Sequence, residues 1–141
     1  TGNTVQNNGS SGISLGSSNN NTITGNTVQN NDSQGIYLIS SANNNTITGN
    51  TVQNNNNYGI CLNASANNNT ITGNTVQNNS GNGINLNSSS NNTITGNILR
   101  GNSSTNIQTV SSNNNLINGN SYGSSSFSGT GNVTTQNIQQ A

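Results

Sequence analysis

The sequence predicts an all-β protein, a right-handed, single-stranded parallel β-helix of about five to six coils with three short strands in each. One unit recurs every 23 or 24 residues along the 141-residue chain, and each unit holds three short stretches of polar–apolar alternation. Gly, Asn and Ser fill the segments between these stretches. A constant period in this range is typical of solenoids, in which each coil packs against its neighbours. The scarcity of helix formers and helix caps argues against a helical repeat.

The period is read from the triplet Thr-Gly-Asn, which recurs in successive units and becomes Asn-Gly-Asn at Gly119. Its glycines are Gly2, Gly25, Gly49, Gly73, Gly96 and Gly119. The intervals between them are 23, 24, 24, 23 and 23 residues. Unit length varies only after the last strand of each unit, so we expect an exposed corner at that point.

The three strands of one coil are predicted from the second unit. Residues 22–24 and 27–29 each place one aliphatic side chain between two polar ones, and in 36–38 two aliphatic side chains flank Tyr37. This alternation is the period of a strand with one buried face. Gly/Asn and Ser/Asn corners connect the strands, so each unit closes one triangular coil.

The inward side chains are expected to stack into aliphatic columns, because neighbouring coils lie about 4.8 Å apart. One column comprises Ile23, Ile47, Ile71, Ile94 and Ile117. A second comprises Val5, Val28, Val52, Val76 and Leu99. The third comprises Ile13, Ile36, Ile60, Ile84 and Ile107, accompanied by Leu15, Leu38, Leu62 and Leu86.

Two columns of asparagine accompany the aliphatic ones. They comprise Asn26, Asn50, Asn74 and Asn97, and Asn31, Asn55, Asn79 and Asn102. Asn tolerates the left-handed backbone of tight corners, and stacked amides can bond along the axis as ladders. We expect both columns to lie inward or at corners with satisfied amides; exposed loop positions are the alternative.

A single domain is expected. Residues 1–120 form the β-helix repeats, and 121–141 form an irregular final coil or a cap that continues the same domain. In that last segment Tyr122 takes the place of the repeated Val, whereas Phe127, Val133 and Ile138 depart from the repeat.

The repeated unit resembles a known family. Asn-Asn-Thr-Ile-Thr-Gly-Asn-Thr-Val-Gln-Asn-Asn followed by Gly-Ile-Tyr-Leu is similar to the right-handed parallel β-helix repeats of the NosD type. That family includes carbohydrate-active proteins and many bacterial and archaeal surface proteins. The resemblance implies the fold over residues 1–120, but the same repeat serves lyases, adhesins and structural chains. The copper association of NosD proteins does not carry over, because His and Met are absent and there is one Cys.

Charge is almost absent from the chain, which carries Asp32, Arg100 and no His. A nucleic-acid partner requires clustered Lys and Arg, and none are present. Attachment to an anionic membrane is excluded on the same ground, and no apolar run reaches the length of a bilayer span. Zero net charge removes the repulsion that keeps copies apart.

We expect no enzyme, no catalytic residue, no metal site and no cofactor. Glycoside hydrolysis typically uses two carboxylates, and Asp32 is alone. A Ser/His/Asp triad lacks its His. A calcium site needs several carboxylate or carbonyl oxygens with net negative charge.

Cys61 is the one thiol, so an intrachain disulfide is excluded. It stands between two inward positions and is therefore expected to point outward. We interpret it as an incidental residue; a thiol that bridges two subunits is the alternative.

Sequons recur once per coil before the Thr-Ile-Thr strand. As candidate N-glycosylation sites they place the acceptor at Asn20, Asn44, Asn68 and Asn91. A chain this rich in Asn, Ser and Thr also produces sequons by chance, so both interpretations stay open.

A Thr-x-Thr array lies on the polar side of the same strands. It comprises Thr22, Thr24, Thr46, Thr48, Thr70, Thr72, Thr93 and Thr95. The array resembles those of ice-binding solenoids. Ordinary strand chemistry explains it as well, because β-branched Thr suits a pleated surface.

The leading functional hypothesis is a non-catalytic structural protein, extracellular or at the cell surface. Thr1 enters the repeat without a preceding cap, and an open end can be covered by another subunit, so head-to-tail stacking would give a filament or surface layer. The partner would be the chain itself, with glycans as further partners. The alternative is a binding module, either an ice-binding face or an adhesin stalk. A fragment of a carbohydrate-active enzyme is the third.

Overall fold

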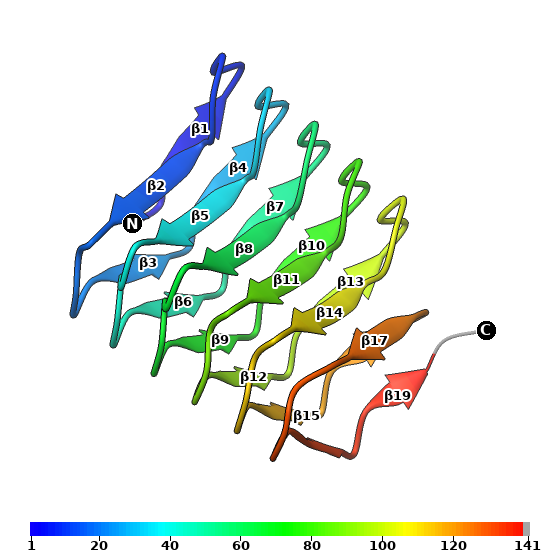
Figure 1. The fold of residues 1–141 in the computed structure, drawn as a ribbon. Helices are drawn as coiled ribbons and strands as arrows, with labels where there is room; N and C mark the ends of the chain where they lie inside the picture. The colour runs from blue at the N-terminus through cyan, green and yellow to red at the C-terminus, as the bar shows by residue number, and fades with distance from the viewer. Residues whose placement is uncertain (140–141) are drawn as a thin grey trace.

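The computed structural model describes residues 1–139 and shows three parallel sheets wound into one β-helix (Figure 1). The predicted fold class is confirmed, with three strands in each coil and no helix between residues 1 and 139. Accordingly, that span contains no helical segment of the length and apolarity needed to cross a membrane.

Each sheet gathers one strand from every coil, and we name two sheets by their inward Val and Leu residues and the third by its outward Thr residues. The Val sheet has the order β1 (Thr4–Gln6), β4 (Thr27–Gln29), β7 (Thr51–Gln53), β10 (Thr75–Gln77), β13 (Ile98–Arg100), β16 (Ser121–Tyr122) and β19 (Ile138–Gln139). The Leu sheet has the order β2 (Ile13–Gly16), β5 (Ile36–Ile39), β8 (Ile60–Asn63), β11 (Ile84–Asn87), β14 (Ile107–Val110) and β17 (Ser125–Phe127). The Thr sheet has the order β3 (Thr22–Thr24), β6 (Thr46–Thr48), β9 (Thr70–Thr72), β12 (Thr93–Thr95), β15 (Leu116–Asn118) and β18 (Val133–Thr135).

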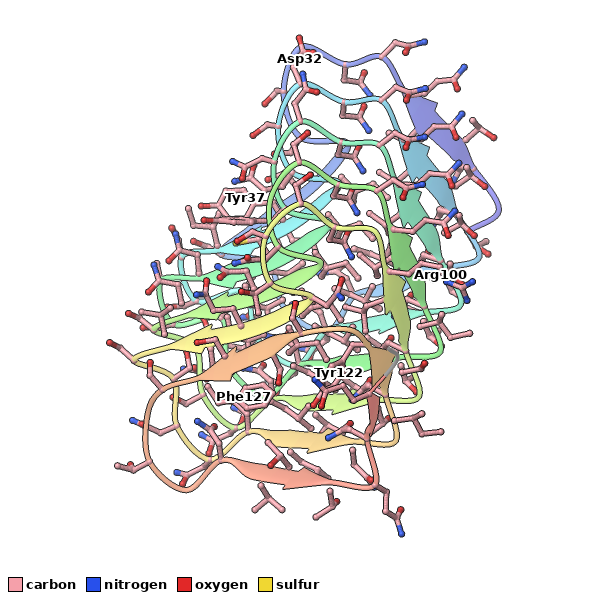
Figure 2. All side chains as sticks on the ribbon, turned by 90° about the vertical axis from the view of Figure 1, so that its right-hand side faces the viewer. Asp32, Tyr37, Arg100, Tyr122 and Phe127 are labelled. Atoms are coloured by element: carbon pink, nitrogen blue, oxygen red, sulfur yellow. The ribbon has the colours of Figure 1, made fainter. Side chains whose placement is uncertain are left out.

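The register places each repeat residue on its equivalent in the next coil. Val28 pairs with Val52, Ile36 with Ile60, and Ile47 with Ile71. The predicted aliphatic columns therefore stack along the axis, and all their members from Val28 to Ile117 are fully buried. Tyr122 continues the Val column and is also buried, and Phe127 packs against the core near the C-terminal end (Figure 2).

Three asparagine ladders run beside the aliphatic columns. Two are the predicted ones, and they are buried with their amides bonded from coil to coil. The third ladder was not predicted, because its members were interpreted as the middle residues of the sequons. It comprises Asn21, Asn45, Asn69, Asn92, Asn115 and Asn132. Its signal was the recurrence of Asn directly before every Thr-Ile-Thr strand.

The last coil is shorter than the others. From Asn120 to Asn137 the ladder advances by 17 residues instead of 23 or 24. Residues 121–139 nevertheless extend all three sheets through β16 to β19. Residues 140 and 141, the last two of the predicted final segment, lie outside the described residues.

Candidate functional site

The outer positions of the Val and Thr sheets repeat the same residue in most coils, whereas both outer columns of the Leu sheet vary. One column carries, in register, Ser14, Tyr37, Cys61, Asn85 and Gln108. The other carries Gly16, Ile39, Asn63, Asn87 and Val110. The segment that leads into each strand adds Tyr58 and Asn82. We call Tyr37, Tyr58, Cys61, Asn82, Asn85 and Gln108 the variable strip. Tyr37 lies on the outer side of the coils (Figure 2).

Hydrogen bonds between coils order the side chains of the strip. The Asn82 Nδ2 donates to Asn85 Oδ1 at 3.1 Å and to Gln108 Oε1 at 2.6 Å, and Asn82 Oδ1 accepts from the backbone N–H of Thr105 at 3.0 Å. The Tyr37 hydroxyl accepts from Asn63 Nδ2 at 3.2 Å. These neutral amides and phenols are therefore held in fixed positions rather than free to rotate.

Cys61 lies on the outer face as expected, since Ile60 and Leu62 on either side of it are in the core. It is not accessible, however, because its exposed fraction is 3%. Tyr37 and Asn85 occupy the paired positions in the neighbouring strands, and Asn85 Nδ2 lies 3.7 Å from Sγ. The alternation of polar and apolar residues along the strand predicts that the thiol lies on the outer side, but it does not predict which side chains cover it. The expectation of an exposed thiol, on which an intersubunit bridge depends, is corrected.

Burial also changes the acidity of this thiol. Removal from water raises the pKa of Cys61 to about 11, and the hydrogen bond from Asn85 opposes the rise. The thiol is therefore protonated at neutral pH, which makes it a poor nucleophile and a poor metal ligand.

The surface formed by residues 1–139 contains no pocket. Small-molecule sites are concave and enclose most of their ligand. Within the variable strip, Cys61, Asn82 and Asn85 are buried, whereas Tyr37, Tyr58 and Gln108 are partly exposed. The accessible part of the strip therefore consists of two tyrosines and one glutamine from three different coils.

The two charges lie apart. Asp32 follows β4 and accepts from Asn56 Nδ2 at 3.4 Å, whereas Arg100 ends β13, three strands further along the Val sheet. That separation is about 14 Å along the axis. Figure 2 shows the two residues on different sides of the coils. Neither therefore supplies charge to the variable strip.

The Thr-x-Thr array occupies the outer face of the Thr sheet in exact register, for example Thr46 on Thr70 and Thr48 on Thr72. Its side chains are partly buried, apart from the exposed Thr22 of the first row, and the Thr95 hydroxyl donates to that of Thr72 at 3.2 Å. The array stops at β15, where Leu116 replaces the first Thr. Ice binding by this face stays a prediction.

The sequon acceptors form a single exposed line. They are Asn20, Asn44, Asn68 and Asn91, with φ values of 61°, 58°, 57° and 59°. Each belongs to a corner with left-handed backbone that precedes the Thr sheet, and the following Asn of each sequon is a ladder residue. Glycosylation of this line also stays a prediction.

The fold and the surface together define a class of protein: a parallel β-helix with two nearly uniform faces and a third face that carries the variable strip. The chain belongs to the family described as periplasmic copper-binding protein (NosD), which it matches over residues 1–139. No curated protein matches the chain.

Solved structures with the same fold are alginate epimerases. A mutant of the periplasmic alginate epimerase AlgG has 20% identity and a TM-score of 0.82, with 97% of this chain and 38% of that chain covered. The A-module of the Azotobacter vinelandii mannuronan C-5 epimerase AlgE6 has 17% identity and a TM-score of 0.70, with 97% and 51% covered. The AlgE4 A-module has 15% identity and a TM-score of 0.62, with 98% and 54% covered. This chain thus spans between about two fifths and about half of each neighbour.

These neighbours contradict the expectation that the chain is not an enzyme, because the solved structures that it resembles are those of epimerases. The exclusion of catalysis rested on the composition of residues 1–141 alone. At 15–20% identity the likeness itself shows the shared fold. The expected location is supported in its coarser form: a periplasmic family and periplasmic neighbours place the chain in the cell envelope or outside it.

The copper in the family description does not fit the residues of this chain. Copper sites use His, Cys and Met ligands. The sequence has neither His nor Met, its one thiol is buried and protonated, and residues 1–139 bring no three His, Cys, Asp or Glu side chains together. These residues therefore provide no copper site.

Proposed function

We propose that this chain is the polysaccharide-contacting part of a cell-envelope β-helix protein, with the variable strip as its contact surface. The observation that carries the proposal is the strip itself. Successive coils present Tyr, Cys, Asn and Gln in this column, while the Thr and Gln columns on the outer face of the Val sheet repeat one residue from β4 to β10. A purely structural face has no need of such differences between coils.

The shape and chemistry of the strip suit a sugar chain. Its partly exposed members Tyr37, Tyr58 and Gln108 carry phenol and amide groups that can bond to sugar hydroxyls, and tyrosine rings present flat apolar faces with a polar edge. Residues 1–139 form no pocket, which favours a ligand that lies along several coils. The epimerase fold of the solved neighbours, which act on alginate or mannuronan by name, supports a carbohydrate ligand.

The charge of the chain narrows the class of polysaccharide. Alginate is a polyanion, and a protein that binds a polyanion tightly supplies several cationic groups. Here the single cation is Arg100, which lies away from the strip. We therefore expect a neutral polysaccharide to bind better than a polyuronate.

A retention experiment on immobilised polysaccharides tests the proposal. The probes are a neutral β-glucan and alginate, each coupled to the same resin at equal density. We expect retention by the β-glucan, weaker retention by alginate, and a loss of about tenfold in affinity for the Tyr37→Ala and Tyr58→Ala double variant. The control is Thr51→Ala on the outer face of the Val sheet, which should bind like the parent chain. Equal retention of parent and double variant would contradict the assignment of the strip.

The structural role expected from the sequence, a filament or surface layer, gains no support from the comparisons. A stalk that displays the variable strip away from the cell is compatible with the binding role.

A further inference from the structure

The backbone fixes the direction in which the Tyr37 hydroxyl can bond. The N–H of Ala64 donates to Asn63 Oδ1 at 2.8 Å, so this contact identifies the oxygen end of the Asn63 amide. The nitrogen end, Nδ2, therefore faces Tyr37 and donates to its hydroxyl oxygen at 3.2 Å. An amide nitrogen cannot accept, so the hydroxyl proton must point away from Asn63. Because Tyr37 is partly exposed on the outer side of the coils, that proton is available to a ligand (Figure 2).

A second amide orients Gln108, which lies three strands further along the Leu sheet than Tyr37. The N–H of Thr105 donates to Asn82 Oδ1 at 3.0 Å, which leaves Asn82 Nδ2 as the donor to Gln108 Oε1 at 2.6 Å. Gln108 Nε2, the other end of this partly exposed amide, has no acceptor among residues 1–139. Tyr37 and Gln108 therefore both present donors, one O–H and one NH₂ group, to a ligand.

The side-chain oxygens of the variable strip, by contrast, are largely occupied. Those of Tyr37, Asn82, Asn85 and Gln108 each accept a hydrogen bond within the fold. The Tyr58 hydroxyl is the exception, since it makes no hydrogen bond in the described part of the chain. The accessible surface of the strip thus carries two donors of fixed direction and one hydroxyl that is free to rotate. Its hydrogen bonding is biased toward donation.

We infer that the variable strip prefers glycans with neutral carbonyl groups, such as acetyl substituents, to glycans with hydroxyl groups alone; the inference rests on the proposed polysaccharide contact. A carbonyl oxygen accepts hydrogen bonds and brings no proton of its own. A hydroxyl that accepts from Tyr37 or Gln108 must still place its own proton, and a donor left unpaired in a closed contact costs free energy. A carboxylate also accepts, but removing its charge from water is costly where no cation lies beside it.

Asn63 is the positioning residue for this preference. Asn63→Asp replaces Nδ2 with an oxygen, so the carboxylate accepts from the Tyr37 hydroxyl and turns its proton away from the ligand. The matched control is Asn87→Asp, which introduces the same charge in the same column one coil further. There the residue that corresponds to Tyr37 is Cys61, which has no hydroxyl to reorient.

Calorimetric titration with a soluble neutral β-glucan, and with the same glucan after partial O-acetylation, tests the inference. We expect the parent chain and Asn87→Asp to bind the acetylated form about fivefold more tightly. Tyr37→Phe and Asn63→Asp should each at least halve this ratio, and the double variant should lower it no further than either change alone. Tyr37→Phe keeps the ring and its packing, so it covers the case in which Asn63→Asp does not fold.

The outcomes separate this inference from the proposed function. Equal affinity of the parent chain for the two glucans would overturn the preference for carbonyl groups and leave the polysaccharide contact in place. A preference that persists in Tyr37→Phe and Asn63→Asp would refute the role of the oriented hydroxyl. Tighter binding of alginate than of the acetylated glucan would refute the choice of a neutral acceptor. Binding of neither glucan would refute the inference and the proposed function together.

Discussion

At the scale of single residues, buried amides hold neighbouring coils together. Asn74 has an exposed fraction of 1%; its Oδ1 accepts from the backbone N–H and Nδ2 of Asn50 at 2.9 and 3.0 Å, and its Nδ2 donates to the carbonyl of Ile47 at 3.0 Å. Polar groups buried in this way stabilise the fold only while every partner is present.

Asn74→Ala should therefore lower the free energy of unfolding by about 3 kcal/mol, because buried donors and acceptors of two coils lose their partner. The control is Asn56→Ala, an exposed position whose Nδ2 makes one long bond to Asp32. It should change stability by less than about 0.5 kcal/mol. Urea unfolding followed by circular dichroism measures both. Equal effects at the two positions would show that the ladders do not carry stability.

The thiol of Cys61 makes stability depend on alkaline pH. Its pKa rises from 9.0 to about 11 on folding, so the folded state keeps a proton that the unfolded state has lost between these values. Stability should be constant below about pH 9, fall as pH rises toward 11, and lose about 2–3 kcal/mol in total from this group. Cys61→Ala should remove that part of the loss. A pH profile that is the same in both would contradict the burial of the thiol.

At the scale of strands and corners, glycine serves two different purposes. Gly49 has a φ of +62° with open space where a Cβ would stand. A Cβ on Gly59 would instead lie 2.4 Å from Val76 Cγ1 and 2.7 Å from the carbonyl oxygen of Gly83. The first glycine is required by the backbone angle and the second by the closeness of the next coil.

The two corresponding alanine variants should differ in cost. Gly49→Ala should cost about 1 kcal/mol, the strain of a left-handed backbone. Gly59→Ala should cost more than about 2 kcal/mol, because neighbouring coils must move apart. Thermal unfolding compares them directly, and a larger loss at Gly49 would contradict the packing described for the Leu sheet.

Periodicity predicted the strands well, because each carries a buried aliphatic residue at a fixed offset. Strands expected at 22–24 and 27–29 are present as β3 and β4, and the third extends one residue beyond 36–38 to Ile39. The third Asn ladder was not predicted because the same Asn residues also form part of the sequons. The cover over Cys61 escaped it because Tyr37 and Asn85 come from coils 24 residues away on either side.

At the scale of the whole molecule, the β-helix has two nearly uniform faces and a third that carries the variable strip. The variable column can be read from the aligned repeats, but its contacts exist only in the stacked structure: Asn82 bonds to Gln108 across 26 residues of sequence. The sequence therefore predicted the architecture and the variable column, but not the hydrogen bonds and burial of its side chains. Composition also led to the exclusion of enzymes, whereas the fold is one that epimerases share.

The most direct test of the central claim is chemical-shift mapping of the isotopically labelled chain during titration with a soluble neutral β-glucan. We predict shifts at the variable strip, strongest around Tyr37, Tyr58 and Gln108, with little change in the Thr sheet. Shifts confined to the Thr or Val sheet, or no shifts at millimolar sugar, would contradict the claim that the variable strip contacts polysaccharide.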